Sequence, residues 1–316
     1  MIKYLAIVIV ILGVLALAGS LWGGFQVSRS LRDYPPTGSF VTVDGTLLHY
    51  VDKGSGRPVI MIHGSDGVLQ DFTITVLDSI AQTNHAVAFD RPGHGYSERL
   101  DGEPMTLSMA ARLIHGAVKQ LGLESPIILG HSYGGAVALQ YALDYPGDVA
   151  GLVLIAPGCY SDGMPFLKSG EKMMKIMGPL MGRNMFVPLA RAMEPSIIKP
   201  SFSPDPVDPV YQEIMREFSS RPSQFRALAD EVVHFGAGLD SISPRYRDIR
   251  IPTIIVAGDA DGMTLIDKTG RRLMNEIPGA ELIVAPGTGH MVHHVHPEVV
   301  VGAVRGLAAT IDQQGR

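Results

Sequence analysis

The stretch "PIILGHSYGGAV", residues 126–137, places one serine among glycines where an apolar run ends. The apolar residues before Gly130 predict a short buried strand. The residues after Gly135 carry apolar side chains at helical spacing as far as Pro146. Ser132 therefore falls in a sharp turn between a strand and a helix, where flanking glycines relieve the crowding of a strained backbone. This G-x-S-x-G pattern is typical of a nucleophile elbow, which exposes a serine hydroxyl at the carboxyl end of a sheet.

The composition describes a folded and mildly acidic protein. The chain has 316 residues, of which 46% are hydrophobic and 18% charged, enough for one large core with an inserted subdomain. Its net charge of −5 and the absence of a basic patch in the sequence argue against nucleic-acid binding. The single cysteine, Cys159, excludes an internal disulfide but does not fix the cellular compartment. The sequence gives no indication of the oligomeric state.

The N-terminal region differs from the rest of the chain. Residues 4–28 include no charged side chain, and this run of 25 residues is long enough to cross a bilayer as a helix. Lys3 precedes the run, Arg29 and Arg32 follow it, and Trp22 lies near its end, where aromatic rings favour the membrane interface. We therefore expect a single-pass membrane protein that contacts the bilayer through this helix.

A cleavable signal peptide is the alternative for the same region. Ala16 and Ala18, on either side of Leu17, have the small-residue pattern of a cleavage site before Gly19, and cleavage would give an exported or periplasmic protein. The apolar run continues beyond that site and exceeds the length of a usual signal peptide, which favours the anchor. The nearly balanced flanking charges leave the membrane orientation open.

Strand-like segments alternate with helical patterns over most of the remaining chain. The segments are residues 39–44, 46–52, 58–63, 85–90, 126–130, 151–157, 251–258 and 280–286. The first two flank Gly45 and predict an antiparallel hairpin. The others are separated by helical patterns, which predicts a mostly parallel sheet covered by helices on both faces.

The alternation fails over residues 159–247, which hold ten of the 22 prolines and eight of the 15 methionines. This stretch predicts a helical cap of short pieces, inserted between two strands of the sheet. Its methionines either fill the cap's own core or line a forgiving apolar pocket. The expected division of the chain is residues 1–28 as anchor or signal peptide, 29–38 as linker, 39–158 as first part of the core, 159–247 as cap and 248–316 as second part of the core.

A serine nucleophile needs a base within hydrogen-bond reach and an acid that orients the base. Both should lie on loops just after strands, because the carboxyl ends of the strands converge near Ser132. After residues 251–258 come Asp259 and Asp261, and after residues 280–286 comes His290. We therefore expect His290 to be the base, with one of the two aspartates as its partner.

The oxyanion hole needs two backbone N–H donors. One is expected from Tyr133, the residue after the serine, and the other from Ser65, in the loop "HGSDG" at residues 63–67. His63 precedes the nucleophile in the chain and is expected to brace this loop rather than act as the base.

The histidines that follow His290 raise the question of a metal site. His293, His294 and His296 crowd one segment, but no carboxylate or cysteine ligand accompanies them in the sequence. We therefore expect no metal, and nothing in the sequence implies another cofactor.

These motifs together resemble those of the α/β-hydrolase superfamily, in the branch that carries a cap. The resemblance covers the chain from about Phe40 to the C-terminus. It rests on five motifs in the right order: "HGSDG" (63–67), "FDRPGHGYSE" (89–98), "GHSYGG" (130–135), "GDAD" (258–261), and "TGH" (288–290) before "HPE" (296–298).

The resemblance implies a fold, a triad and a class of reactions. It implies a mostly parallel eight-stranded sheet with helices on both faces and an inserted helical cap. The family's acid position corresponds to Asp261, with Asp259 as the minority choice. A serine at the nucleophile position argues against the dehalogenase and epoxide-hydrolase relatives, whose nucleophile is an aspartate.

We therefore expect a membrane-anchored serine hydrolase that acts on a lipophilic carboxylic ester through Ser132, His290 and Asp261. Hydrolysis of C–C, lactone or amide bonds and cofactor-free peroxidase chemistry stay open, because fold does not determine function. A non-catalytic membrane receptor or scaffold is the alternative outside enzymes, and the intact triad pattern weighs against it.

Overall fold

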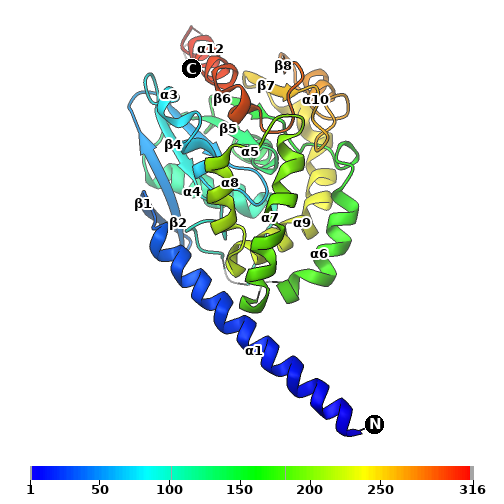
Figure 1. Cartoon of the computed structure of the whole chain (residues 1–316). Coiled ribbons are helices and arrows are strands. Elements are labelled where there is room, and N and C mark those ends of the chain that lie inside the picture. The colour runs from blue at the N-terminus through cyan, green and yellow to red at the C-terminus, as the bar shows by residue number, and fades with distance from the viewer. Residues whose placement is uncertain (1, 101, 182, 314–316) are drawn as a thin grey trace.

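The computed structural model describes residues 2–100, 102–181 and 183–313, and within them it contains one eight-stranded sheet (Figure 1). The strands are β1 (Ser39–Val43), β2 (Thr46–Lys53), β3 (Pro58–Ile62), β4 (His85–Phe89), β5 (Ile127–His131), β6 (Gly151–Ile155), β7 (Thr253–Gly258) and β8 (Glu281–Ala285). Their order in the sheet is β1-β2-β4-β3-β5-β6-β7-β8. Only the β1–β2 and β2–β4 pairs are antiparallel among these strands. The predicted fold class is confirmed.

Helices cover both faces of this sheet. On one face lie α4 (Leu107–Gln120), α5 (Tyr133–Asp144) and α10 (Gly270–Glu276), and on the other lie α2 (Gln70–Thr73), α3 (Leu77–Ile80), α11 (Val292–Val295) and α12 (Pro297–Gln313). The central strands carry apolar side chains on both faces of the sheet, because successive side chains point alternately into the two helical layers. In β3, Ile60 and Ile62 join the α4–α5 layer, whereas Val59 and Met61 join the α12 layer.

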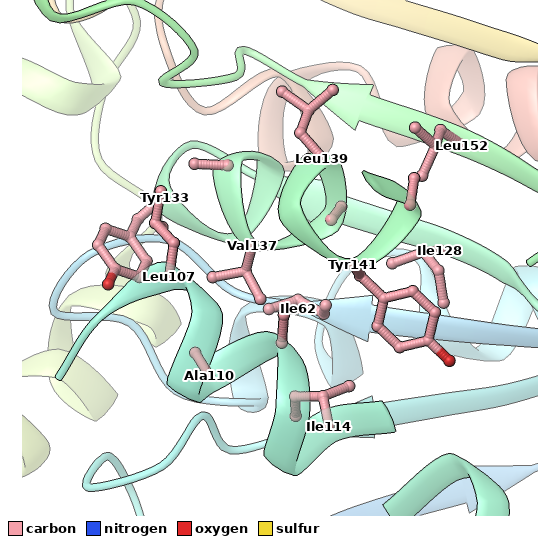
Figure 2. Packing of buried hydrophobic residues seen from close by; sticks show 14 of the residues in the cluster. Ile62, Leu107, Ala110, Ile114, Ile128, Tyr133, Val137, Leu139, Tyr141 and Leu152 are labelled. Atoms are coloured by element: carbon pink, nitrogen blue, oxygen red, sulfur yellow. The ribbon is translucent and has the colours of Figure 1, made fainter. Parts of the chain in front are cut away.

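Figure 2 shows the layer formed by α4 and α5 from close by, where Ile62 of β3 packs with Ile114 of α4 and Val137 of α5. All three side chains are fully buried. Burying one side chain of this size contributes about 1.5–3 kcal/mol relative to leaving it exposed. This layer holds α5 against the sheet and so fixes the position of the residue that precedes the helix.

Between β6 and β7, the described part of the chain forms helices and no strand. They are η1 (Ser161–Gly163), α6 (Leu167–Met181), η2 (Asn184–Phe186), α7 (Val187–Phe202), α8 (Pro209–Phe218), α9 (Pro222–Ile242) and η3 (Ser243–Asp248). These helices are longer than the prolines led us to expect, and α9 has 21 residues. Pro222 occupies the first turn of α9, where proline starts a helix rather than ending it. Pro179 of α6 and Pro195 and Pro200 of α7, in contrast, lie inside helices that continue past them.

The N-terminal helix α1 (Ile2–Asp33) is continuous over 32 residues and extends away from the body of the molecule (Figure 1). By length and composition, its span from Lys3 to Asp33 is a candidate membrane helix or signal sequence. It runs through the first five residues of the segment expected to be a linker. An ion pair between Arg29 and Asp33, 3.1 Å apart and one helical turn from each other, supports this extension.

Candidate active site

Ser132 stands alone between β5 and α5 in a left-handed backbone conformation, with φ +52°. Its N–H donates to the carbonyl of Ile155 on β6 at 2.9 Å, which ties the turn to the neighbouring strand. A Cβ atom on Gly130 would overlap the carbonyl of Gly134, and one on Gly134 would overlap the carbonyl of Ile62. The two glycines are therefore required by close backbone approach, as the sequence pattern predicted.

Asp261 and His290 come together from the loops after β7 and β8. His290 Nδ1 donates to Asp261 Oδ2 at 2.7 Å, and both side chains are buried. With its proton on Nδ1, the neutral ring leaves Nε2 free to accept a proton. Asp261 also accepts hydrogen bonds from the Met263 N–H at 2.7 Å and the Thr264 hydroxyl at 2.6 Å.

These contacts keep Asp261 charged despite its burial. Burial raises the pKa of this carboxyl, but the adjacent His290 and the hydrogen bonds from Thr264 outweigh that effect and lower the pKa below its usual 3.8. An ionised carboxylate at this position can orient the His290 ring and can stabilise it if the ring becomes positively charged. The sequence analysis did not single out Thr264, although its place three residues after Asp261 fits a turn in which the carboxylate caps the backbone.

Asp259, the other aspartate considered for this role, lies on the surface. Its Oδ1 accepts from the N–H of Gly287 at 2.6 Å, so it closes the loop that leads toward His290. No hydrogen bond joins it to His290 among the described contacts. The structure thus brings Asp261, and not Asp259, to the histidine.

The loop expected to supply an oxyanion donor passes directly beside the serine. A Cβ on Gly64 would lie 3.2 Å from the Cβ of Ser132, and a turn from Gly64 to Gly67 carries Ser65 at this point. Tyr133 is the first residue of α5, so its N–H has no carbonyl partner one turn earlier in the helix. Both predicted donors therefore belong to backbone that adjoins Ser132.

A buried arginine stabilises this loop through hydrogen bonds to its backbone. The Arg91 guanidinium donates to the carbonyls of His63 at 3.0 Å and Gly64 at 2.9 Å, and it pairs with Glu231 of α9. His63 Nε2 accepts from the Arg91 N–H at 3.0 Å. Arg91 was not predicted as part of the site, because the sequence offers no sign that this charge is buried; its partner lies 140 residues away.

A second buried cluster adjoins the site and overturns one expectation. The histidines after His290 were expected to lack a carboxylate, but Asp71 Oδ1 from α2 accepts from His293 Nε2 at 2.9 Å and from His294 Nε2 at 2.8 Å. Asp71 Oδ2 lies 3.6 Å from His131 Nδ1, and His131 Nε2 donates to the carbonyl of His290 at 3.3 Å. The sequence could not reveal this contact, because Asp71 precedes His293 by 222 residues.

This cluster connects the strand end before Ser132 with the loop that carries His290. Asp71, His293 and His294 are also the described residues whose ligand atoms approach one another within 4.8 Å, so they are the set that could hold a metal ion. Hydrogen bonds already join both histidines to the carboxylate without an ion. His296 points elsewhere and pairs with Glu298 at 3.1 Å.

Two buried histidines beside the site should make the stability of the protein depend on pH. Burial lowers the pKa of His63 to about 3 and that of His131 to about 3. In the unfolded chain a histidine has a pKa of ~6.5, so between about pH 6.5 and 3 the unfolded state binds protons that the folded state does not. In this window the free energy of unfolding should therefore decrease as the pH is lowered, by up to about 1.4 kcal/mol per pH unit for each histidine.

Denaturant unfolding at pH 7 and pH 5 measures this loss. Between pH 7 and pH 5, the His131→Asn variant should lose about 2 kcal/mol less unfolding free energy than the native chain. This figure takes into account that the unfolded histidine begins to bind protons near pH ~6.5. The control is His296→Asn, which removes a partly exposed histidine rather than a buried one. Identical losses in the His131→Asn variant and the native chain would contradict the prediction.

Ser132 and His290 both line a cavity of about 350 Å³ that is covered by the cap. Its apolar lining includes six methionines: Met173, Met174, Met193, Met215, Met263 and Met291. None of the described lining residues is a lysine or arginine, whereas Asp66, Asp71 and Glu194 are acidic. Burial raises the pKa of Asp66 to about 6. The cavity therefore suits a neutral apolar molecule better than an anion.

Comparison with known proteins agrees with this fold. The model of the "Alpha/beta hydrolase family" matches residues 59–303. The 2-hydroxy-6-oxononadienedioate/2-hydroxy-6-oxononatrienedioate hydrolase of Comamonas testosteroni is 24% identical over 270 residues, which cover 83% of this chain and 93% of that protein. A solved α/β hydrolase fold protein from Burkholderia ambifaria superposes with a TM-score of 0.74 at 22% identity, over 84% of this chain and 96% of that one.

A third relative is similar over a shorter stretch. The dihydrolipoyllysine-residue acetyltransferase component of the acetoin cleaving system of Cupriavidus necator is 38% identical over 127 residues, or 40% of this chain. The match spans only 33% of that relative's length.

Proposed function

The chain belongs to the alpha/beta hydrolase family, and we propose that within it the protein is a serine hydrolase of lipophilic carboxylic esters. One observation carries the proposal: Ser132 and His290 meet an apolar cavity rich in methionine and free of lysine and arginine among its described lining residues. Flexible methionine side chains repack around acyl groups of different shape.

The proposed reaction follows from the roles that the site residues can take. Ser132 Oγ attacks the ester carbonyl while His290 Nε2 accepts its proton, and Asp261 stabilises the charged ring. The N–H groups of Ser65 and Tyr133 stabilise the negative oxygen of the tetrahedral intermediate. His290 then protonates the leaving alcohol, and water releases the acyl group from Ser132 by the same steps in reverse.

Cleavage of a C–C bond in a hydroxy-oxo diacid is the second candidate, because the relative from Comamonas testosteroni bears that substrate's name and aligns along most of the chain. A diacid would have to be bound without a lysine or arginine among the described lining residues and beside Asp66, Asp71 and Glu194. The charge of the cavity therefore supports the ester over the diacid.

We further propose that α1 anchors the enzyme in a membrane as a single uncleaved span. Its length, its lack of charge over residues 4–28 and its continuity as far as Asp33 support this assignment. The mass of the mature chain tests it: a chain that begins at Gly19 would establish a signal peptide instead.

The substrate class is tested with p-nitrophenyl esters of increasing acyl length, in the presence of detergent. We expect kcat/KM to rise at least tenfold from acetate to medium-length acyl chains, because each buried methylene contributes about 0.8 kcal/mol. The enzyme should leave 2-hydroxy-6-oxononadienedioate intact. A preference for acetate over every longer ester, or turnover of the diacid alone, would contradict the proposal.

Two alanines of α7 provide a matched pair of variants for this test. Ala190 lines the cavity, whereas Ala192 is exposed on another face of the same helix. Ala190→Phe should fill part of the cavity and lower activity on long esters more than on acetate. Ala192→Phe should keep the native preference.

A further inference from the structure

Exposed large apolar side chains outside α1 gather on one part of the described surface. Eight of these ten residues belong to the cap, and only Phe40 and Ile74 lie elsewhere. The eight, here called the cap face, are Phe166, Met173, Ile176, Met177, Leu189, Met193, Ile197 and Val210. Those from α7 recur every four residues, at 189, 193 and 197, so they share one side of the helix. A concentration of this kind marks an interaction surface.

The charge around the cap face is opposite to that of the whole protein. Residues 164–210, from which the cap face comes, contain six basic and four acidic side chains, whereas the chain as a whole carries a net charge of −5. Exposed apolar side chains on a segment of net positive charge are the combination that binds the surface of an anionic bilayer.

The docking of α1 fixes where a membrane would lie relative to the cap. From about Gly19 onward α1 packs on η2, α7 and α8, and a Cβ on Gly23 would overlap the carbonyl of Asn184 in η2. Farther along α1, the Ser30 hydroxyl donates to the carbonyl of Glu217 at 3.2 Å and accepts from Arg221 Nε at 3.2 Å. The cap and the second half of α1 are therefore joined by direct contacts.

The length of the undocked part of α1 brings the cap to the bilayer. The 15 residues from 4 to 18 span only about 22 Å at the helical rise of ~1.5 Å per residue. The hydrocarbon core is about 30 Å thick, so a spanning α1 must stay within it until about Gly23, where η2 is already in contact. Trp22 stands at this level, as expected of a residue that favours the interface. Any tilt of the helix would bring the cap still closer to the membrane.

The cavity opens through the cap face. Met173, Met193 and Ile197 line the cavity, yet they are 52%, 45% and 60% exposed. These three residues come from α6 and α7, which lie on the side of the molecule toward α1 in Figure 1. The route between solvent and Ser132 is thus bordered by side chains that a bilayer would cover.

We propose that the cap face rests in the lipid surface and that acyl-chain substrates pass from the membrane leaflet directly into the cavity between α6 and α7. The inference rests on the proposed function and adds the partner, a bilayer with anionic headgroups, and the route of entry. Entry from the leaflet keeps the acyl chain out of water along its whole path.

Fluorescence quenching tests the contact with lipid, because Trp22 is the single tryptophan of the chain. The full chain is placed in vesicles of phosphatidylcholine and phosphatidylglycerol with brominated acyl chains. In a Trp22→Phe background, a Leu189→Trp reporter on the cap face should be quenched at least twofold. The control reporter, Ala309→Trp, is exposed on α12 at the opposite end of the molecule and should not be quenched (Figure 1).

The outcomes separate this inference from the proposed anchor. If native Trp22 is quenched but Leu189→Trp is not, α1 inserts without the cap, and the inference is overturned. If Trp22 itself escapes quenching, the anchor fails together with the inference.

Kinetics test the route of entry. Ile176→Glu and Leu189→Glu alter the cap face outside the cavity lining. Both variants should lower the rate on long-chain esters held in vesicles at least tenfold and should leave the hydrolysis of a short soluble ester unchanged. Ile74→Glu, at an exposed apolar position on the core, is the control and should match the native enzyme on both substrates. Equal rates of all three variants on vesicle substrates would contradict the route, whereas inactivity of the native enzyme on every ester would contradict the proposed function instead.

Discussion

Replacing Ser132 with alanine is expected to lower kcat by a factor on the order of 10⁴–10⁶ while the protein stays folded. In the proposed mechanism this side chain supplies the nucleophile, and no other hydroxyl among the described lining residues of the cavity stands at an elbow between strand and helix. His290→Ala should cost about as much, and the double variant little more, because the two groups act as one unit. The rate of ester hydrolysis at saturating substrate measures the effect.

Ser65→Ala is the control for this prediction. Ser65 lines the same cavity, but its proposed contribution is the backbone N–H, which alanine retains. Its activity should stay within a few-fold of the native value. A folded Ser132→Ala protein with near-native turnover would refute the assignment of the nucleophile.

The second large effect is expected at Asp261. Asp261→Asn should lower kcat about 10⁴-fold, because an amide can present its NH₂ to His290 and so favour the tautomer that carries the proton on Nε2. The matched control is Asp259→Asn, two residues earlier and at the surface, where the side chain contacts the N–H of Gly287. It should lower kcat by no more than a few-fold. The opposite order of the two effects would transfer the role of the acid to Asp259.

Local patterns predicted the sheet and the elbow because the cause of each feature lies within a few residues. The apolar runs determine the buried strands, and the need for Gly130 and Gly134 follows from the turn at Ser132. The positions of Asp261 and His290 could be anticipated for a similar reason: each follows a strand, and the carboxyl ends of parallel strands share one edge of the sheet.

The rest of the site depends on contacts between distant parts of the chain. Asp71 looked like an ordinary polar residue of a short helix until the fold placed it against His293 and His294. Arg91 is fully buried against Glu231, a pairing that a single sequence does not reveal. Buried charges break the rule that charged side chains face water, so sequence patterns miss them.

The packing of α1 was also beyond prediction. Its apolar run indicated a membrane helix, but contact with η2 depends on Gly23, whose missing side chain admits the Asn184 carbonyl. Two further contacts help to explain why the helix continues into the expected linker: Ser30 and Tyr34 are bound by cap residues.

The central claim is that Ser132 is an activated nucleophile in a site built by His290 and Asp261. A fluorophosphonate probe tests it most directly, because the probe bonds covalently to serines whose hydroxyl is activated by a neighbouring base. Mass spectrometry of the labelled full chain should locate one adduct, on Ser132, and the adduct should disappear in the folded His290→Ala variant. An unlabelled native protein, or an adduct on a different serine, would contradict the account.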